Sequence, residues 1–344
     1  MSKPILVIKF GTASITKQNG EISEPTILEI ARQVAVLHQS YNIVLVSSGA
    51  VGAGKHFIKN YKGEIAERKA AAAIGNPLLL GIYSKFFSAF DIPIAQSLCE
   101  RQHFANRGQF LQLKETYQEL WKNGIIPIAN ENDVVSNIEL KFSDNDELAT
   151  LIAVGFGAEA LLFSTSVGGL LNAQGEIIDT VAQVNAQTMA LANDSKSATG
   201  LGGMVSKLTF TRLATTMGIK VVIFGVNTPE GILKAVRQET GTVFSPQVVS
   251  HTARQKWLAS GSLVRARLWV DLGASKALLA RKSLLAVGIS KIDGDFDESE
   301  VVEILNPEGY VLAVARVKHS SIEMAKNLKT QNFEIAHADD IVLI

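Results

Sequence analysis

The chain of 344 residues is poor in cysteine and has no long apolar run. Cys99 is the only cysteine, which excludes an internal disulfide and a cysteine-based metal cluster, and a lone cysteine is expected in a core. No stretch approaches the roughly 20 apolar residues that a membrane span needs. The apolar run within residues 1–10 is too short for a secretory signal. The sequence therefore predicts a soluble, cytoplasmic protein with no membrane partner.

An excess of charge is also missing. The 33 basic and 33 acidic residues cancel, so bulk electrostatics predict no polyanionic partner. The six histidines show no paired spacing typical of a metal site, and no G-x-S-x-G pattern occurs, which argues against a zinc enzyme and a serine hydrolase. What is present is an apolar fraction of 47%, enough for globular cores, in a chain long enough for two domains.

Up to about residue 250, short runs rich in β-branched residues alternate with longer helical patterns. The alternation predicts an α/β fold with a largely parallel open sheet and helices on both faces. Helical periodicity is clear over residues 27–37 and 110–121. The strand-like runs are residues 5–8, 43–46, 92–95, 125–129, 161–163 and 220–224.

From about residue 263 the rhythm changes to short strands separated by turns such as Asn306-Pro307-Glu308-Gly309. This spacing predicts a separate β-rich domain of about 80 residues. The strands expected in it are residues 268–270, 301–304, 311–314 and 341–343. The predicted division is a first domain over residues 1–250, a linker over residues 251–262 and a second domain over residues 263–344.

Two glycine patterns imitate nucleotide-binding signatures. Residues 49–56, GAVGAGKH, match the start of a P-loop, but His56 stands where the magnesium-binding hydroxyl belongs, and no second strand ends in a suitable Asp. Residues 155–160, GFGAEA, match a dinucleotide fingerprint, but they follow a helical pattern and precede a strand, the reverse of what that motif needs. We interpret the first match as accidental and the second as a turn between a helix and a strand.

Small or polar residues follow nearly every predicted strand of the first domain. Open α/β sheets bind ligands at the carboxyl ends of their strands, so these residues are expected to form one site. Lys9 ends the first strand, where its side chain can aim into the ligand crevice. Residues 200–207, GLGGMVSK, form a glycine-rich loop that runs into a helix carrying Lys207. Such a loop presents free backbone N–H groups and a helix N-terminus to phosphate.

Acidic and amide side chains gather in two further segments. Residues 130–133, NEND, directly follow the predicted strand at 125–129, and residues 143–147, SDNDE, open an apolar helix over residues 148–154 as its cap. Both segments are therefore expected at the rim of the sheet. A carboxylate there can pair with an ammonium group, and an asparagine amide can donate to a carboxylate. The ligand suggested is a zwitterion, an amino acid.

The motifs that carry this chemistry are Lys9-Phe10-Gly11-Thr12, Ser47-Ser48-Gly49-Ala50, Asn130-Glu131-Asn132-Asp133-Val134-Val135, Asp144-Asn145-Asp146 and Gly202-Gly203-Met204-Val205-Ser206-Lys207. Together they resemble the glutamate 5-kinases of the amino acid kinase family. The resemblance covers nearly the whole chain in order and spacing, and the N-E-N-D-x-V segment is the part that favours this branch. The C-terminal segment is similar to the PUA domain that many members carry.

The resemblance implies transfer of the ATP γ-phosphoryl group to the side-chain carboxylate of L-glutamate, with ATP as co-substrate and Mg²⁺ carried on its phosphates. The implied catalytic residues are Lys9, Lys207 and Asp146, the last holding the two lysines in position. The implied glutamate-binding residues are Ser48, Asp133 and Asn145. The implied ATP-binding residues are Lys9, Thr165, Ser166, Leu201, Gly202, Gly203, Met204, Val205, Ser206 and Lys207. A homo-oligomer, and contact of the PUA-like domain with RNA, are expected from the same resemblance.

The chain departs from the family on the nucleotide side. Ser166 and Leu171 replace an acid and an aromatic residue of the family's T-D-x-x-G-L-Y segment, and Leu201 replaces a threonine, which predicts an altered nucleotide pocket. Aspartokinase, acetylglutamate kinase and uridylate kinase are the competing interpretations within the family, and N-E-N-D-V-V argues against all three. An RNA-binding module with a degenerate kinase domain is the alternative from another class. The mixed charge of residues 263–344 argues against it.

Overall fold

A computed structural model describes residues 3–17, 20–135, 144–193, 203–247, 266–298 and 300–343. The chain divides into two compact units, the first comprising Met1–Glu100 and Leu111–Val249, the second Arg101–Phe110 and Ser250–Ile344. The predicted linker, residues 251–262, lies outside the described residues. The domain boundaries drawn from the sequence therefore stay a prediction.

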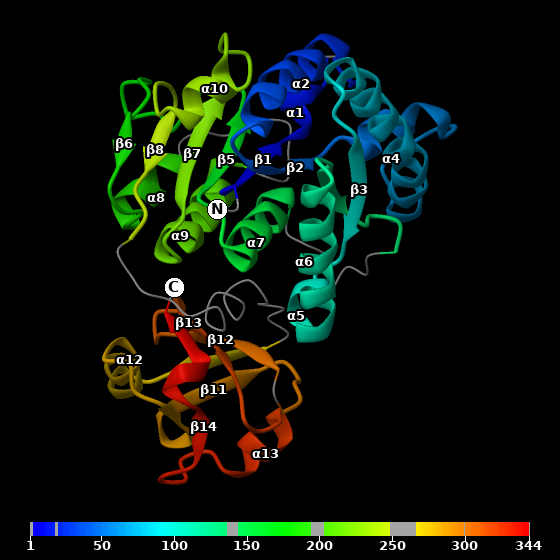
Figure 1. The fold of residues 1–344 in the computed structure, drawn as a ribbon. Coiled ribbons are helices and arrows are strands. Elements are labelled where there is room, and N and C mark those ends of the chain that lie inside the picture. The colour runs from blue at the N-terminus through cyan, green and yellow to red at the C-terminus, as the bar shows by residue number, and fades with distance from the viewer. Residues whose placement is uncertain are drawn as a thin grey trace. The chain divides into compact units, whose positions relative to one another are not determined.

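The first unit is built on an eight-stranded sheet with the order β3-β4-β2-β1-β5-β7-β8-β6 (Figure 1). The six strands from β3 to β7 in this order are parallel, and β8 runs antiparallel to β7. The strands are β1 (Ile5–Phe10), β2 (Asn42–Ser47), β3 (Ile94–Cys99), β4 (Ile126–Glu131), β5 (Ala160–Thr165), β6 (Thr180–Val181), β7 (Lys220–Gly225) and β8 (Thr242–Phe244). The predicted parallel α/β sheet is confirmed, whereas the short strands β8 and β6, which extend the sheet beyond β7, are additional.

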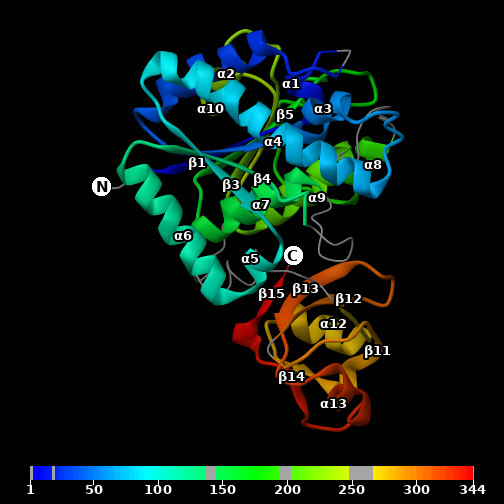
Figure 2. The same ribbon diagram turned by 90° about the vertical axis from the view of Figure 1, so that its right-hand side faces the viewer.

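Helices cover both faces of this sheet, with α2 and α10 on one face and α7 and α9 on the other (Figure 1, Figure 2). The described helices up to residue 247 are α1 (Thr12–Ile15), α2 (Glu24–His38), α3 (Ala50–Gly54), α4 (Ile65–Phe87), α5 (Gln102–Ala105), α6 (Arg107–Lys122), α7 (Asn145–Phe156), α8 (Ala186–Asn193), α9 (Met204–Thr216) and α10 (Gly231–Val236), with the 3-10 turns η1 (Lys55–Phe57) and η2 (Ser88–Phe90). Of these, α5 and residues 107–110 of α6 belong to the second unit. None of the described helices combines the length and the apolar composition that a bilayer crossing demands.

The pleat of β1 separates apolar side chains from a charged one. Leu6, Ile8 and Phe10 are fully buried in the core cluster shared with α2, α4 and α10. Successive side chains of a strand point to opposite faces, so Lys9 points to the face covered by α7 and α9. This alternation directs the only lysine of the strand toward the helices that carry the other predicted catalytic residues.

Two glycines let the backbones of α3 and α4 touch. A Cβ atom on Gly54 would lie 1.9 Å from the carbonyl oxygen of Ala71, and one on Gly75 would lie 1.7 Å from the carbonyl oxygen of Ala50. No larger side chain fits at either position. Gly54, the second glycine of the P-loop-like match, thus serves the contact between two helices, in line with the interpretation of that match as accidental.

The second glycine pattern is a turn between a helix and a strand, as predicted. Helix α7 ends at Phe156, and Gly157 follows in the left-handed conformation with φ 75°, donating its backbone N–H to the last turn of the helix. Strand β5 begins three residues later at Ala160. A glycine that ends a helix in this conformation is a common C-terminal cap.

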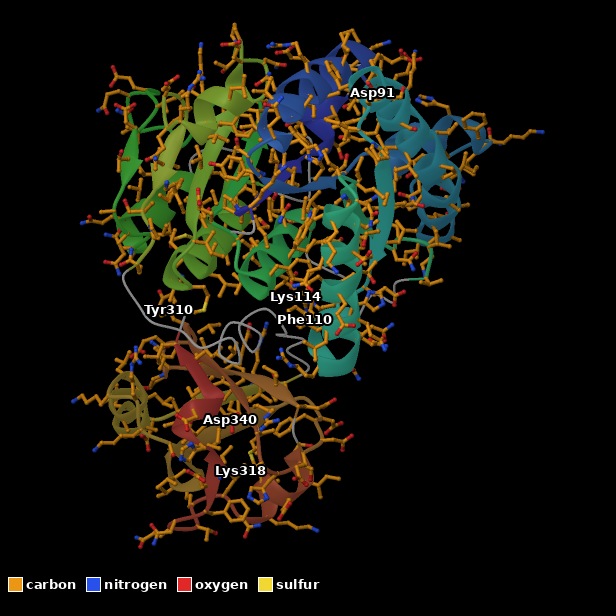
Figure 3. All side chains as sticks on the ribbon, in the orientation of Figure 1. Asp91, Phe110, Lys114, Tyr310, Lys318 and Asp340 are labelled. Carbon is orange, nitrogen blue, oxygen red and sulfur yellow. The ribbon has the colours of Figure 1, made fainter. Side chains whose placement is uncertain are left out.

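The second unit contains a five-stranded sheet with the order β11-β9-β12-β13-β15 and a separate β10–β14 pair. Its own apolar cluster, which includes Leu268, Val302 and Ile335, confirms a β-rich unit with a separate core. Asp340, labelled in Figure 3, pairs with Arg316 at 3.5 Å within this unit. The elements are β9 (Arg267–Val270), α12 (Leu272–Leu279), β10 (Leu284–Leu285), η4 (Ala286–Gly288), β11 (Ile289–Asp293), β12 (Val301–Leu305), β13 (Val311–Arg316), α13 (Ser321–Lys326), β14 (Glu334–Ala336), η5 (Ala338–Asp340) and β15 (Ile341–Leu343).

Candidate active site

A buried carboxylate flanked by two lysines lies at the carboxyl end of β1. Lys9 Nζ lies 2.6 Å from Asp146 Oδ1, and Lys207 Nζ donates to Asp146 Oδ2 at 3.0 Å. Asp146 has no exposed surface, while Lys9 and Lys207 are 4% and 7% exposed. The three residues predicted to act in catalysis are therefore brought together from β1, α7 and α9.

The charges of this triad are unequal. Burial alone would raise the pKa of the Asp146 carboxyl, but Lys9 and Lys207 outweigh it and hold that pKa below its ordinary value. Asp146 is therefore ionised at neutral pH, and two ammonium groups share one carboxylate. The Asp144 carboxyl is a second acidic group close enough to Lys9 for their charges to interact. Within the triad itself positive charge exceeds negative charge, and an anion beside the lysines, such as a phosphate, would balance it.

The start of α7 fixes the position of Asp146 and connects it to α9. Asp144 is the N-terminal cap of α7, and its Oδ1 atom accepts from the backbone N–H of Asp146 at 2.9 Å and of Glu147 at 3.2 Å. Its Oδ2 atom accepts from Ser206 Oγ at 2.5 Å. Burial, and then the charge of Asp146, raise the pKa of the Asp144 carboxyl. The cap predicted for this helix is confirmed, although the helix begins at Asn145, earlier than expected.

Beside the charged triad lies a network of amide side chains. Asn145 Nδ2 donates to Ser48 Oγ and to Asn130 Oδ1, both at 2.9 Å. The backbone N–H of Glu131 donates to Asn130 Oδ1 at 3.0 Å and to Asn145 Oδ1 at 3.3 Å. Two of the predicted glutamate-binding residues, Ser48 and Asn145, are thus in direct contact. Because Asn145 and Asp146 are neighbours in α7, the polar and charged parts of the site are continuous.

Helix α4 adds two buried polar residues that were not predicted from the sequence. Asn76 Oδ1 accepts from Asn130 Nδ2 at 3.0 Å, and Asn76 is 6% exposed. The Tyr83 hydroxyl lies 3.0 Å from Ser47 Oγ, which donates to the Ser48 carbonyl at 3.1 Å. Burial raises the pKa of the Tyr83 hydroxyl, so Tyr83 stays a neutral hydrogen-bonding group at neutral pH. A single polar residue in a helix gives no sequence signal for such a role.

The other predicted residues lie on the same edge of the sheet where the structure describes them. Asp133 is half-buried in the turn that follows β4. Thr165 ends β5 half-buried, and Ser166 is exposed directly after it. Gly203 is the residue before α9, and Met204, Val205 and Ser206 form its first turn. Leu201 and Gly202, with Ser143 of the second acidic segment, lie outside the described residues.

Comparisons with known proteins match both units of the chain. Residues 4–225 match the amino acid kinase family, and residues 266–337 match the PUA domain. A glutamate 5-kinase of Rippkaea orientalis is 36% identical over 337 residues, covering 94% of this chain and 91% of that protein. The glutamate 5-kinase of Moorella thermoacetica is 34% identical over 364 residues, covering 98% of this chain and 96% of its own length.

Solved structures resemble a large part of the chain. A carbamate kinase of Giardia aligns with a TM-score of 0.51 and 18% identity, over 72% of this chain and all of that one. Carbamate kinase from Giardia lamblia bound to AMP-PNP aligns with a TM-score of 0.53 and 16% identity, over 72% of this chain and 99% of its own length. At this level of identity the likeness shows the fold alone.

Proposed function

The chain belongs to the glutamate 5-kinase branch of the amino acid kinase family, and from this premise we propose how its residues carry out the reaction. The reaction transfers the γ-phosphoryl group of ATP to the side-chain carboxylate of L-glutamate and gives L-glutamyl 5-phosphate and ADP, the first step of proline biosynthesis. The observation that carries the proposal is the buried Lys9–Asp146–Lys207 triad.

The difficulty of this reaction is electrostatic. The glutamate carboxylate is ionised at neutral pH, so it attacks the γ-phosphorus without a general base. A carboxylate oxygen forms a bond to phosphorus while the bond to the β–γ bridging oxygen breaks, and ADP leaves with that electron pair. Lys9 and Lys207 hold the transferring group and the carboxylate together against their mutual repulsion and stabilise the charge on the phosphoryl oxygens. Asp146 is a positioning residue, since it holds both ammonium groups at one place.

The substrates approach this triad from two sides. Ser48, Asn145 and Asp133 are proposed to bind glutamate, Asp133 through the α-ammonium group. Lys9, Lys207 and the segments at residues 165–166 and 201–206 are proposed to bind ATP. The first turn of α9 supports the nucleotide side, because a helix N-terminus preceded by glycine favours phosphate.

Mg²⁺ is proposed to enter with ATP. Both carboxylate oxygens of Asp146 are engaged by lysines, and those of Asp144 by backbone N–H groups and Ser206, so neither is left to hold a metal ion alone. A metal ion carried on the nucleotide phosphates fits this donor set. Bound there, it would neutralise part of the phosphate charge.

Glutamate-dependent formation of ADP is expected to require Mg²⁺, and hydroxylamine is expected to trap the acyl phosphate as a hydroxamate. The reason is that an acyl phosphate is an activated carboxyl group that a strong nucleophile captures. A coupled assay of ADP release and a colorimetric hydroxamate assay measure the two products. If aspartate or acetylglutamate gave hydroxamate while glutamate gave none, the substrate assignment would be wrong.

Asp133→Asn is expected to raise the KM for glutamate by one to two orders of magnitude and to leave the KM for ATP near its original value. The change removes a charge that is proposed to face the substrate ammonium, and such a charge-assisted hydrogen bond is worth about 1.5–3 kcal/mol. Asp91→Asn is the matched control, since Asp91 is exposed in a turn (Figure 3). A shift in the KM for ATP instead would place Asp133 on the nucleotide side.

Three expectations from the sequence stay predictions: a homo-oligomer, a cytoplasmic location and contact of the PUA domain with RNA. The match of residues 266–337 to the PUA domain supports the last of these as a proposal. Titration of the whole chain with a labelled structured RNA, at low and at physiological salt, would test it, because a contact limited to phosphates weakens steeply with salt.

A further inference from the structure

The buried amide of Asn76, which belongs to the polar network, has one hydrogen-bond donor without a partner among the described residues. Asn76 lies in α4 and is 6% exposed. Its Oδ1 atom accepts from Asn130, whereas its Nδ2 atom is buried and has no hydrogen-bond partner among the described residues. Buried polar groups in folded proteins are nearly always paired, so an unpaired donor beside a substrate site points to a ligand atom.

The orientation of this amide follows from a single backbone group. The N–H of Glu131 can only donate, so the atoms that it faces in Asn130 and Asn145 are the oxygens. The Nδ2 atom of Asn130 therefore faces Asn76, and the Asn76 atom that accepts this hydrogen bond must be Oδ1. Reversing the Asn76 amide would set two NH₂ groups against each other. The free atom of Asn76 is therefore the donor.

Close packing brings Asn76 to the turn that carries Ser48. The residue before it, Gly75, lies so near α3 that a Cβ atom there would be 1.7 Å from the carbonyl oxygen of Ala50. Ala50 follows Ser48 by two residues. Through Asn130 and Asn145, the Asn76 side chain is also linked to Ser48 Oγ. Asn76 and Ser48 thus border one polar site from two elements.

The Ser48 hydroxyl is also able to donate a hydrogen bond. Its Oγ atom accepts from Asn145 Nδ2, and it is an acceptor in every side-chain contact described for it. A hydroxyl that accepts in this way still carries its own O–H donor. Two neutral donors, one hydroxyl and one amide, suit a carboxylate that is to be bound without being activated.

We propose that Asn76 is a substrate-binding residue whose Nδ2 atom donates to the α-carboxylate of glutamate. The inference rests on the proposed function, since it assigns the second carboxylate of the same substrate. The reacting carboxylate must lie beside Lys9 and Lys207, where the phosphoryl group is transferred. The carboxylate that does not react is left for the neutral donors on the other side of Asn145.

Asn76→Asp tests this assignment with little change in size. The aspartate keeps an oxygen for Asn130 but sets a negative charge where the donor was. At mildly alkaline pH the KM for glutamate is expected to rise about 100-fold, because two carboxylates then face each other. The KM for ATP is expected to stay near the wild-type value, whereas a buried carboxylate without a partner is expected to lower the melting temperature.

The decisive measurement uses the α-amide of glutamate, which retains the reacting carboxylate. Wild-type protein is expected to prefer glutamate to this amide, and Asn76→Asp to lose or reverse that preference, since an aspartate can accept from the amide. Asn76→Leu, which removes the donor without adding charge, is expected to weaken the preference about 10-fold. The Asn76→Leu variant also tests the assignment if the aspartate variant does not fold.

The outcomes distinguish a failure of the Asn76 assignment from a failure of the proposed kinase function. If wild-type protein forms no hydroxamate with glutamate, the proposed function fails. If wild-type protein is active and both variants keep the wild-type ratio of kcat/KM for glutamate and its α-amide, Asn76 does not face the α-carboxylate and the inference is overturned. Loss of melting temperature with an unchanged ratio would assign Asn76 a structural role only.

Discussion

Replacing Lys207 by alanine is expected to lower kcat by two to three orders of magnitude, a loss of about 2–4 kcal/mol of transition-state stabilisation. Lys207 is 7% exposed and donates to Asp146 beside Lys9. A fixed cation in such a buried site, where the dielectric constant is low, stabilises the transferring phosphoryl group more than a solvent-exposed cation does. Steady-state kinetics measure the effect, and the KM for glutamate is expected to change less than kcat, because Lys9 and the proposed glutamate-binding residues remain.

Lys122→Ala is the matched control for this experiment. The Lys122 side chain is 70% exposed on α6 and pairs only at the surface, with Glu119. Its loss is expected to leave kcat unchanged, because exposed ion pairs contribute little. Circular dichroism shows whether each variant is folded. A folded Lys207→Ala protein with wild-type kcat would contradict the role given to the loop at residues 200–207.

The charged part of the site could be predicted from the sequence because its residues follow strands and open helices. Lys9 is the last residue but one of β1, Asp146 lies in the first turn of α7, and Lys207 is the fourth residue of α9. Parallel strands place such residues at one edge of the sheet. The glycine before α9 and the Asp144 cap are local signals of the same kind.

The amide network could not be predicted in this way, because it depends on tertiary packing. Asn76 stands in the middle of a long helix, and only the approach of α3 and α4 at Gly75 and Ala50 brings it to the site. Gly54 at this crossing belongs to the P-loop-like match in the sequence. Strands β6 and β8 are two and three residues long, too short for any periodicity to mark them.

Asp146→Asn is expected to lower both the free energy of unfolding and kcat. The amide has nearly the same shape as the carboxylate, but it removes the negative charge that pairs with both Lys9 and Lys207. Removing one partner of a buried ion pair typically costs about 3–5 kcal/mol of stability. Urea unfolding at neutral pH measures the stability, and the coupled assay measures the turnover.

Glu119→Gln makes the same chemical change at the surface. Glu119 pairs with Lys122, and the Glu119 side chain is 65% exposed, so water replaces the lost contact. Its unfolding midpoint is expected to match that of the wild-type protein. A comparable loss in both variants would mean that burial adds nothing to the Asp146 pairs, and the role of Asp146 in holding the lysines would be contradicted.

The stability difference between wild type and Asp146→Asn is expected to depend on pH in a definite direction. The two lysines hold the folded pKa of Asp146 below its ordinary value, so the carboxylate contributes stability that is fully present above the unfolded pKa of about 3.9 and is lost as the pH falls through the folded pKa. The asparagine variant has no such proton to bind. The difference in unfolding free energy between wild type and Asp146→Asn is therefore expected to be constant from neutral pH down to about pH 5 and to shrink below about pH 4. A difference that grew on acidification would mean that Asp146 is protonated more readily in the folded state than in the unfolded one. The two ammonium groups would then not be its partners.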